Sequence, residues 1–264
     1  MCCRRVGWLV ALVGLTGCYT SYNLATQRQE ISVTSTAREL RMGAAIAQRV
    51  LERFEPVEDA AMQARVQTIG ERLAAHSDRR DVPYHFSVVE GKDIRDAINA
   101  FTIPGGYIFV NQALMEFVKD DDELASVLAH EIGHTAARHP VKRYETLMAS
   151  SLGQLLVMGA ARDRELQQGL HVIFTQMFLA YAREDELLAD RLAVAYLRAA
   201  GFDPEGAVRL LTRLKRREQR KAQPRVYSYF RTHPYMADRL SVVREAITGR
   251  LGFDDYINRT APGE

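Results

Sequence analysis

The chain has 264 residues, of which 47% are hydrophobic, a size and composition that suit one globular domain with its own core. Its formal charge is +2, and without Arg4 and Arg5, which lie in a segment we expect to be removed, basic and acidic residues balance at 33 each. A near-neutral protein lacks the basic field on which nucleic-acid binding depends, so the composition excludes that class of function.

The N-terminus is typical of an exported protein. Arg4 and Arg5 precede an apolar run at residues 6–15 that is too short to span a bilayer. The run ends in L-T-G-C at residues 15–18, which resembles a bacterial lipobox. That resemblance implies a signal peptide at residues 1–17 and a lipid on the Cys18 thiol, the alternative being an ordinary signal peptide with a chance cysteine.

Acylation would hold the chain on a membrane, because buried acyl chains contribute about 0.8 kcal/mol per CH₂. Tyr19 follows the cysteine where Asp would retain a lipoprotein at the inner membrane, which favours the outer membrane, facing the periplasm. Cys2 and Cys3 would leave with the signal, so the mature chain would have no cysteine for a disulfide or a thiolate ligand. We expect the polar residues 18–36 to be a tether.

Residues 37–250 form the expected domain, followed by a tail at 251–264. Helical periodicity runs through residues 37–54 and 57–75, divided at Pro56. Residues 84–89 predict a strand, and residues 100–103 and 107–110 flank a P-G-G turn typical of a hairpin, whose second strand we expect at the edge of a small sheet. The chain beyond residue 110 predicts helices almost throughout.

Residues 130–134 read H-E-I-G-H within one of these helices. Four acidic residues at 120–123 favour the start of that helix, and Pro140 is expected to end it. His130 and His134 are one turn apart, so both imidazoles leave the same face and can converge on one metal ion. Glu131 lies at the edge of that face, where it can reach a water molecule without binding the ion. This pattern predicts a zinc-dependent peptide hydrolase.

Catalytic zinc normally has three protein ligands, so one more must come from elsewhere. A helix predicted at residues 180–200 carries several acidic residues, of which Glu186 is one candidate, and its neighbours Glu184 and Asp185 are rivals. Spacing alone leaves this choice open.

Four separated motifs occur in the order found in one protease family. They are N-A-F at 99–101 with I-P-G-G-Y-I at 103–108, H-E-x-x-H extended through A-A-R-H at 136–139, R-x-x-E-x-x-A-D at 183–190, and T-H-P at 232–234 with Arg239. Over residues 40–248 the chain resembles the gluzincin zinc metallopeptidases of the CAAX-prenyl-protease and HtpX type, in particular exported bacterial lipoproteins of the BepA and LoiP kind. Leu188 stands where the family usually has Glu, but Glu186 is retained.

The resemblance implies an α+β, mainly helical zincin-type domain with a small sheet beside the H-E-x-x-H helix. It also implies one Zn²⁺ per chain, bound by His130, His134 and Glu186, with Glu131 as the general base. Asp190 would orient a ligand histidine or donate a proton.

Two further residues, His233 and Arg239, are expected to stabilise the oxyanion. For His233 two alternatives stay open: an inhibitory ligand that approaches the zinc, and a buried helix cap. We expect His139 to be structural and to point away from the ion. Residues 147–161 predict a helix near the mouth of the site, or alternatively a mobile lid.

The expected function is that of a metalloendopeptidase of the bacterial envelope. Its partners would be unfolded or misassembled envelope proteins, and it would reach the membrane through its N-terminal lipid. The alternative is a chaperone-like outer-membrane assembly factor with little or conditional proteolysis. The sequence ends soon after the last predicted helix, which leaves no room for the helical repeats of such factors and favours a plain protease.

Overall fold

The computed structural model describes residues 19–92, 94–95, 97–158, 180–219 and 229–249. Our expectations for residues 1–17 and for the tail at 251–264 therefore lie outside the described residues.

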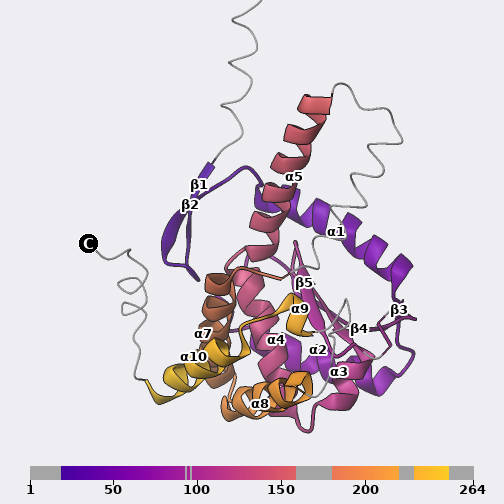
Figure 1. Ribbon diagram of the computed structural model, residues 1–264, viewed down its shortest axis with the longest axis vertical. Helices are drawn as coiled ribbons and strands as arrows, with labels where there is room; N and C mark the ends of the chain where they lie inside the picture. Colours follow the sequence, from indigo (N-terminus) through magenta and orange to yellow (C-terminus); the bar gives the residue numbers. More distant parts are fainter. Residues whose placement is uncertain (1–18, 93, 96, 159–179, 220–228, 250–264) are drawn as a thin grey trace, which may run out of the picture.

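The fold is mainly helical with two small sheets, the α+β class that we expected (Figure 1). The strands are β1 (Tyr19–Asn23), β2 (Arg28–Ser32), β3 (Glu55–Pro56), β4 (His85–Glu90), β5 (Ala100–Ile103) and β6 (Tyr107–Asn111). The described helices are α1 (Thr36–Arg53), α2 (Ala60–Ala74), α3 (Gln112–Phe117), α4 (Asp121–Ala136), α5 (His139–Met158), α7 (Arg183–Ala199), α8 (Glu205–Gln219), α9 (Tyr229–Thr232) and α10 (Met236–Thr248).

The larger sheet has the strand order β3-β4-β6-β5, with β4 and β6 parallel and the other pairs antiparallel. The hairpin β5–β6 forms where the P-G-G turn predicted it, and Gly105 and Gly106 adopt the positive φ values that the turn requires. Our expectation that its second strand is the edge was wrong. β6 pairs on both sides, because the hairpin docks on β4 through β6, and β5 is the edge strand.

Residues 19–32, expected to be a tether, instead fold into the antiparallel hairpin β1–β2. The Asn23 side chain accepts a hydrogen bond from Ala25 N at 2.9 Å and so closes the turn between the strands. The hairpin is also attached to the domain, since Ser32 Oγ donates to Glu145 of α5 at 2.7 Å. Turn chemistry within the hairpin and this long-range bond fold a segment whose polar composition predicted only a tether.

Helix α4 lies in the middle of the domain, where it packs against α2, α7 and α8 (Figure 1). Asp120 caps its N-terminus by accepting a bond from Glu123 N, and the apolar side chains of Leu124, Leu128 and Ile132 are fully buried. A helix enclosed in this way is held rigidly by its neighbours.

The end of α4 differs from our expectation. The helix stops at Ala136, Arg138 adopts a left-handed conformation (φ 59°), and Pro140 lies in the first turn of α5 rather than after α4. Proline is well suited to that position, because a first-turn residue needs no backbone N–H donor.

Among the described residues, no helix combines the length and the apolar character needed to cross a membrane. The apolar stretch at residues 147–158 belongs to α5, as the sequence predicted, whereas residues 159–161 lie outside the described residues.

Candidate metal centre

Four side chains from three parts of the chain meet beside α4. His130 and His134 come from α4, Glu186 from α7, and His233 from the turn after α9, and one nitrogen or oxygen atom of each lies within 4.8 Å of the others. The Nε2 atoms of His130 and His134 are 3.0 Å apart, and Glu186 Oε1 lies 3.4 Å from His134 Nε2. All four side chains are buried.

Gly133 permits this meeting, because it lets α7 approach α4 closely. A Cβ atom at this position would lie 2.9 Å from the carbonyl oxygen of Ala189, closer than side chains tolerate. Gly133 has no side chain to take part in the chemistry, but the close approach of α7, which carries Glu186, depends on it. Of the rivals, Glu186 is the carboxylate inside the cluster, and Glu184 is exposed to solvent.

Asp190 holds the ring of His130 from behind. Its Oδ1 atom lies 2.9 Å from His130 Nδ1, which leaves Nε2 facing the cluster. Burial and the Arg239 cation lower the pKa of His130, but the Asp190 and Glu186 carboxylates outweigh them and raise it to about 9. The ring is thus held strongly by its acidic partners.

Arg239 is fully buried and binds the same carboxylates. Its Nε and Nη2 atoms donate to the two oxygens of Asp190 at 2.8 and 2.7 Å, and its Nη1 lies 3.2 Å from Glu186 Oε2. Nη2 also donates to the Tyr229 hydroxyl at 3.0 Å. From the sequence we expected Arg239 to stabilise the oxyanion together with His233. In the structure its guanidinium instead contacts the carboxylates of Asp190 and Glu186.

His134 has a support of its own, which the sequence did not suggest. His139 Nδ1 lies 2.8 Å from His134 Nδ1, and His139 Nε2 lies 3.2 Å from Asp185 Oδ1. We expected His139 to be structural and to point away from the ion; it lies outside the group of candidate ligands but contacts the outer nitrogen of His134. The ring of Tyr181 stacks on the ring of His134, with the two ring centroids 4.1 Å apart.

Neither Tyr181 nor Tyr229 belongs to a motif, so no sequence signal identified them. Asp185 and His139 did lie within motifs, but their roles depend on contacts between α5 and α7 that spacing does not give.

Glu131 is completely buried next to the cluster. Neither of its carboxylate oxygens has a hydrogen-bond partner among the described residues, although His233 Nε2 lies 3.4 Å from Oε1. Burial raises the pKa of this carboxyl, partly offset by His233 and His130. Buried carboxylate oxygens without partners are costly, which indicates a group made to contact something that binds there.

These residues fit a metal ion. Both Nδ1 atoms of the paired histidines are engaged on the outer side, so both Nε2 atoms are directed into the cluster. Glu186 Oε2 forms an ion pair with Arg239 but makes no hydrogen bond among the described residues. Two imidazoles and a carboxylate are the donor set of a catalytic zinc site. The arrangement is consistent with one metal ion, and its donor chemistry favours zinc.

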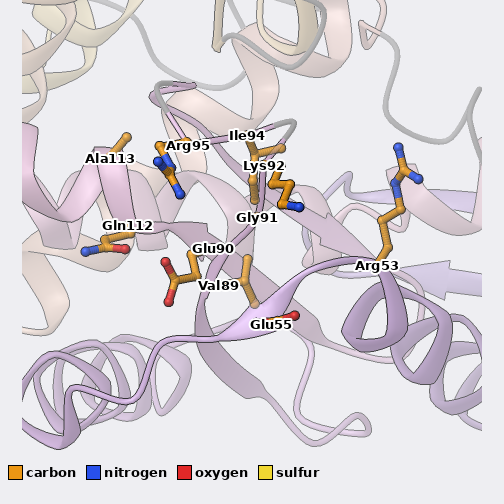
Figure 2. Close-up of a pocket in the computed structure, with 10 residues that line it drawn as sticks. All are labelled: Arg53, Glu55, Val89, Glu90, Gly91, Lys92, Ile94, Arg95, Gln112 and Ala113. Atoms are coloured by element: carbon orange, nitrogen blue, oxygen red, sulfur yellow. The ribbon is translucent and has the colours of Figure 1, made fainter.

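A separate hollow of about 410 Å³ lies at the C-terminal end of β4, and none of the residues that line it belongs to this cluster. Figure 2 shows Glu55 and Glu90 at this hollow together with the cationic side chains of Arg53, Lys92 and Arg95. These five side chains are exposed and include both positive and negative charges. They therefore differ from the buried ligand candidates of the metal centre.

The model of one protein family, Peptidase family M48, matches residues 60–247, which is more than half of the chain. The chain belongs to peptidase family M48. With its H-E-x-x-H residues and Glu186 assembled in the buried group, this M48 peptidase is a zinc metallopeptidase.

Curated relatives of this M48 peptidase include two kinds of protease. It is 27% identical over 222 residues to the beta-barrel assembly-enhancing protease of Escherichia coli K12, covering 81% of this chain and 44% of the relative. A putative protease of the same name from Vibrio cholerae is 30% identical over 211 residues, covering 75% and 42%. The mitochondrial metalloendopeptidase OMA1 of Schizosaccharomyces pombe is 30% identical over 181 residues, covering 68% and 51%. The chain thus spans about half or less of the length of these relatives.

Proposed function

We propose that this M48 peptidase is a zinc endopeptidase of the bacterial cell envelope that degrades misfolded or misassembled envelope proteins. The observation that carries the proposal is Glu131, which is buried beside the group formed by His130, His134 and Glu186 and has no hydrogen-bond partner in the described part of the chain. Metal binding alone does not require such a carboxylate, whereas peptide hydrolysis does. The bacterial relatives named as beta-barrel assembly-enhancing proteases support a place in the envelope.

His130, His134 and Glu186 would hold the zinc, which when bound polarises the scissile carbonyl and makes a water molecule more acidic. Glu131 accepts the proton of the attacking water and passes it to the nitrogen of the leaving amine. A general base works best when its pKa lies near the working pH, and burial shifts the Glu131 carboxyl in that direction.

Asp190 orients His130 through the 2.9 Å contact with its Nδ1 atom, which suits it to a positioning task more than to proton donation. Arg239 holds both Asp190 and Glu186. His233 is the better placed of the two expected oxyanion groups, because the guanidinium of Arg239 is already bound to these two carboxylates.

The position of His233 favours the inhibitory alternative for the arrangement described here. Its Nδ1 atom lies 3.3 Å from His130 Nε2 and 3.0 Å from Glu186 Oε1, so it lies among the atoms that would bind the metal and could act as a further ligand. Its Nε2 atom lies 3.3 Å from the carbonyl oxygen of Ala100 in the edge strand β5. The same side chain therefore contacts both a candidate metal ligand and one main-chain group of the sheet edge.

An extended peptide can bind by adding a strand to a sheet edge, which gives affinity with little dependence on sequence. β5 is the strand that offers such an edge here, but its residues are buried. A substrate that paired with β5 would have to displace His233 from Ala100, and this displacement would also move His233 away from the candidate metal ligands. Unfolded chains, which expose extended segments, are the substrates that suit this requirement.

We further propose that acylation of Cys18 places the enzyme on the outer membrane, facing the periplasm. The L-T-G-C sequence supports the lipid, and the bacterial relatives support the compartment.

The alternative is an assembly factor that binds outer-membrane proteins and rarely cuts them, which the words "assembly-enhancing" in the relatives' name favour. The test compares cleavage of one outer-membrane β-barrel protein in two forms, unfolded and folded in detergent, by the zinc-loaded enzyme and by Glu131→Gln. Cleavage of the unfolded form alone, absent in the variant, supports quality control. Binding of the unfolded form without cleavage by either protein supports the assembly factor.

A further inference from the structure

The hairpin β1–β2 has one strongly apolar exposed face. Along residues 20–24 and 29–35, on either side of the turn, more exposed and more buried residues alternate, so the two faces of the hairpin have different environments. The exposed large apolar side chains are Tyr22 (59% exposed), Leu24 (62%), Ile31 (76%) and Val33 (48%). Only two other large apolar side chains in the described part of the chain, Leu51 and Tyr235, are comparably exposed.

The strand register places these side chains on the same face. Ile31 lies opposite Thr20, and Tyr22 lies opposite Gln29; one pair of the ladder separates these two pairs, so they point to the same face. Leu24 and Val33 continue the alternation at the two ends. We call this surface, formed by Tyr22, Leu24, Ile31 and Val33, the outer face of the hairpin.

Polar contacts fix the opposite face on the domain. Ser32 Oγ donates to Glu145, Lys142 Nζ donates to Glu30 at 2.7 Å, and Arg138 Nη2 donates to the Thr34 carbonyl at 2.7 Å. The outer face is therefore held in one orientation relative to the metal centre, because Arg138 lies next to His139, which supports His134. Figure 1 shows the hairpin at the outer edge of the molecule, apart from the four-stranded sheet.

We infer that the outer face docks on the surface of the membrane that carries the lipid anchor. This inference rests on the proposed acylation of Cys18. Strand β1 begins at Tyr19, the residue that follows Cys18, and consecutive Cα atoms are about 3.8 Å apart. An anchor at Cys18 thus leaves no spacer between lipid and hairpin, and the nearest apolar phase to the outer face is the bilayer itself.

The chemistry of the outer face suits this partner. Aliphatic side chains with a tyrosine, on an otherwise polar domain, are typical of surfaces that enter the boundary between headgroups and acyl chains. A lipid on a flexible linker would leave the domain free to rotate. Docking of the hairpin would instead fix the orientation of the active site relative to the membrane, where misassembled membrane proteins are found.

The chain offers a clean probe of this contact. Its only tryptophan is Trp8, in the expected signal peptide, so a tryptophan introduced into the mature chain would be the only one. We would compare Ile31→Trp with Leu51→Trp as a matched control. Leu51 is 40% exposed and lies near the end of α1, roughly 22 Å along the helix axis from Thr36 at its start.

Each variant would be placed on vesicles of phosphatidylethanolamine and phosphatidylglycerol, with and without acyl chains brominated near the headgroup. The natural acyl anchor is used if mass spectrometry finds it. If processed Cys18 is instead a free thiol, the protein is coupled through it to a maleimide lipid. The hairpin is then tested even if acylation, and with it the proposed location, proves wrong.

We expect brominated lipid to reduce the fluorescence of Ile31→Trp at least two-fold and to leave Leu51→Trp unchanged, with the zinc content and casein cleavage of both variants at the wild-type level. Equal quenching of the two variants, or none in Ile31→Trp, would overturn the inference. Loss of quenching together with a dimer in sedimentation would assign the outer face to a second copy of the chain instead.

Discussion

The Nδ1 atoms of His134 and His139 lie 2.8 Å apart, and this contact determines which nitrogen of His134 can bind a metal ion. Asp185 lies at the other nitrogen of His139, so the His139 Nε2 atom carries the proton and its Nδ1 atom accepts. His134 must then donate from Nδ1, which leaves a lone pair on Nε2 directed into the cluster. Support of a ligand histidine by a hydrogen bond on its outer nitrogen is a general feature of zinc sites.

We therefore predict that His139→Ala lowers zinc affinity about 10–100-fold while the protein still folds. Competition with a chelator of known affinity measures the change. His139→Asn is the matched control, because its amide oxygen can accept the bond from His134 Nδ1 and should recover part of the affinity. Equal losses in both variants would indicate a packing defect rather than a lost hydrogen bond.

Metal content provides a direct test of the ligand assignment. We predict one zinc ion per wild-type chain and near-complete loss in His134→Ala, measured by elemental analysis after dialysis. His85→Ala is a suitable control, since that histidine is exposed on β4 and outside the cluster. Full occupancy in His134→Ala would refute the assignment.

Removal of the buried carboxylate separates binding from chemistry. Glu131→Gln should keep its zinc and lower kcat by at least about 10²-fold, since general-base groups contribute about 10²–10⁴. Casein cleavage by the zinc-loaded proteins is the measurement, with circular dichroism as the check on folding. Turnover equal to wild type would mean that another group accepts the proton.

The lipid anchor has a chemical signature. Mass spectrometry of the protein extracted from membranes should find an N-terminal Cys18 that carries acyl chains. Cys18→Ser should move the protein from the membrane to the soluble periplasmic fraction. A free Cys18 thiol on a wild-type soluble form would contradict the prediction.

The sequence predicted the helices and the approach of His130 to His134 because both depend on local spacing. His130 and His134 are one turn apart in any α-helix, and periodicity placed α1 and α2 within a few residues of their observed ends. The order of the strands could not be predicted in the same way, because the pairing of β4 with β6 depends on contacts distant in sequence.

The role of His139 was hidden for a related reason. In one continuous helix a residue five positions after His134 would point roughly 140° away from it. The left-handed conformation of Arg138 ends that helix and turns the chain, so that His139 returns to the ring of His134. Arg138 is an unusual residue for this conformation, and no motif marks it as a turn. The fold of residues 19–32 was likewise hidden, since their bonds to α5 are formed across more than a hundred residues.

His233 gives the most informative single substitution, because the two proposed roles predict opposite results. Its Nδ1 atom lies among the ligand atoms, and its Nε2 atom faces both Glu131 Oε1 and the Ala100 carbonyl. If His233 blocks the catalytic position, His233→Ala should raise kcat on casein, because a catalytic zinc needs one open coordination position. The variant should also bind an extended peptide inhibitor more tightly, because the Ala100 carbonyl of β5 is released. If His233 stabilises the oxyanion, the same change should lower kcat by roughly 10–10³-fold with zinc retained.

Thr232→Val is a control at the neighbouring residue, since it removes a hydrogen bond to Asn99 without changing a residue of the cluster. Wild-type kinetics with a lower melting temperature in His233→Ala would show that the side chain only caps the turn, and both roles would be wrong.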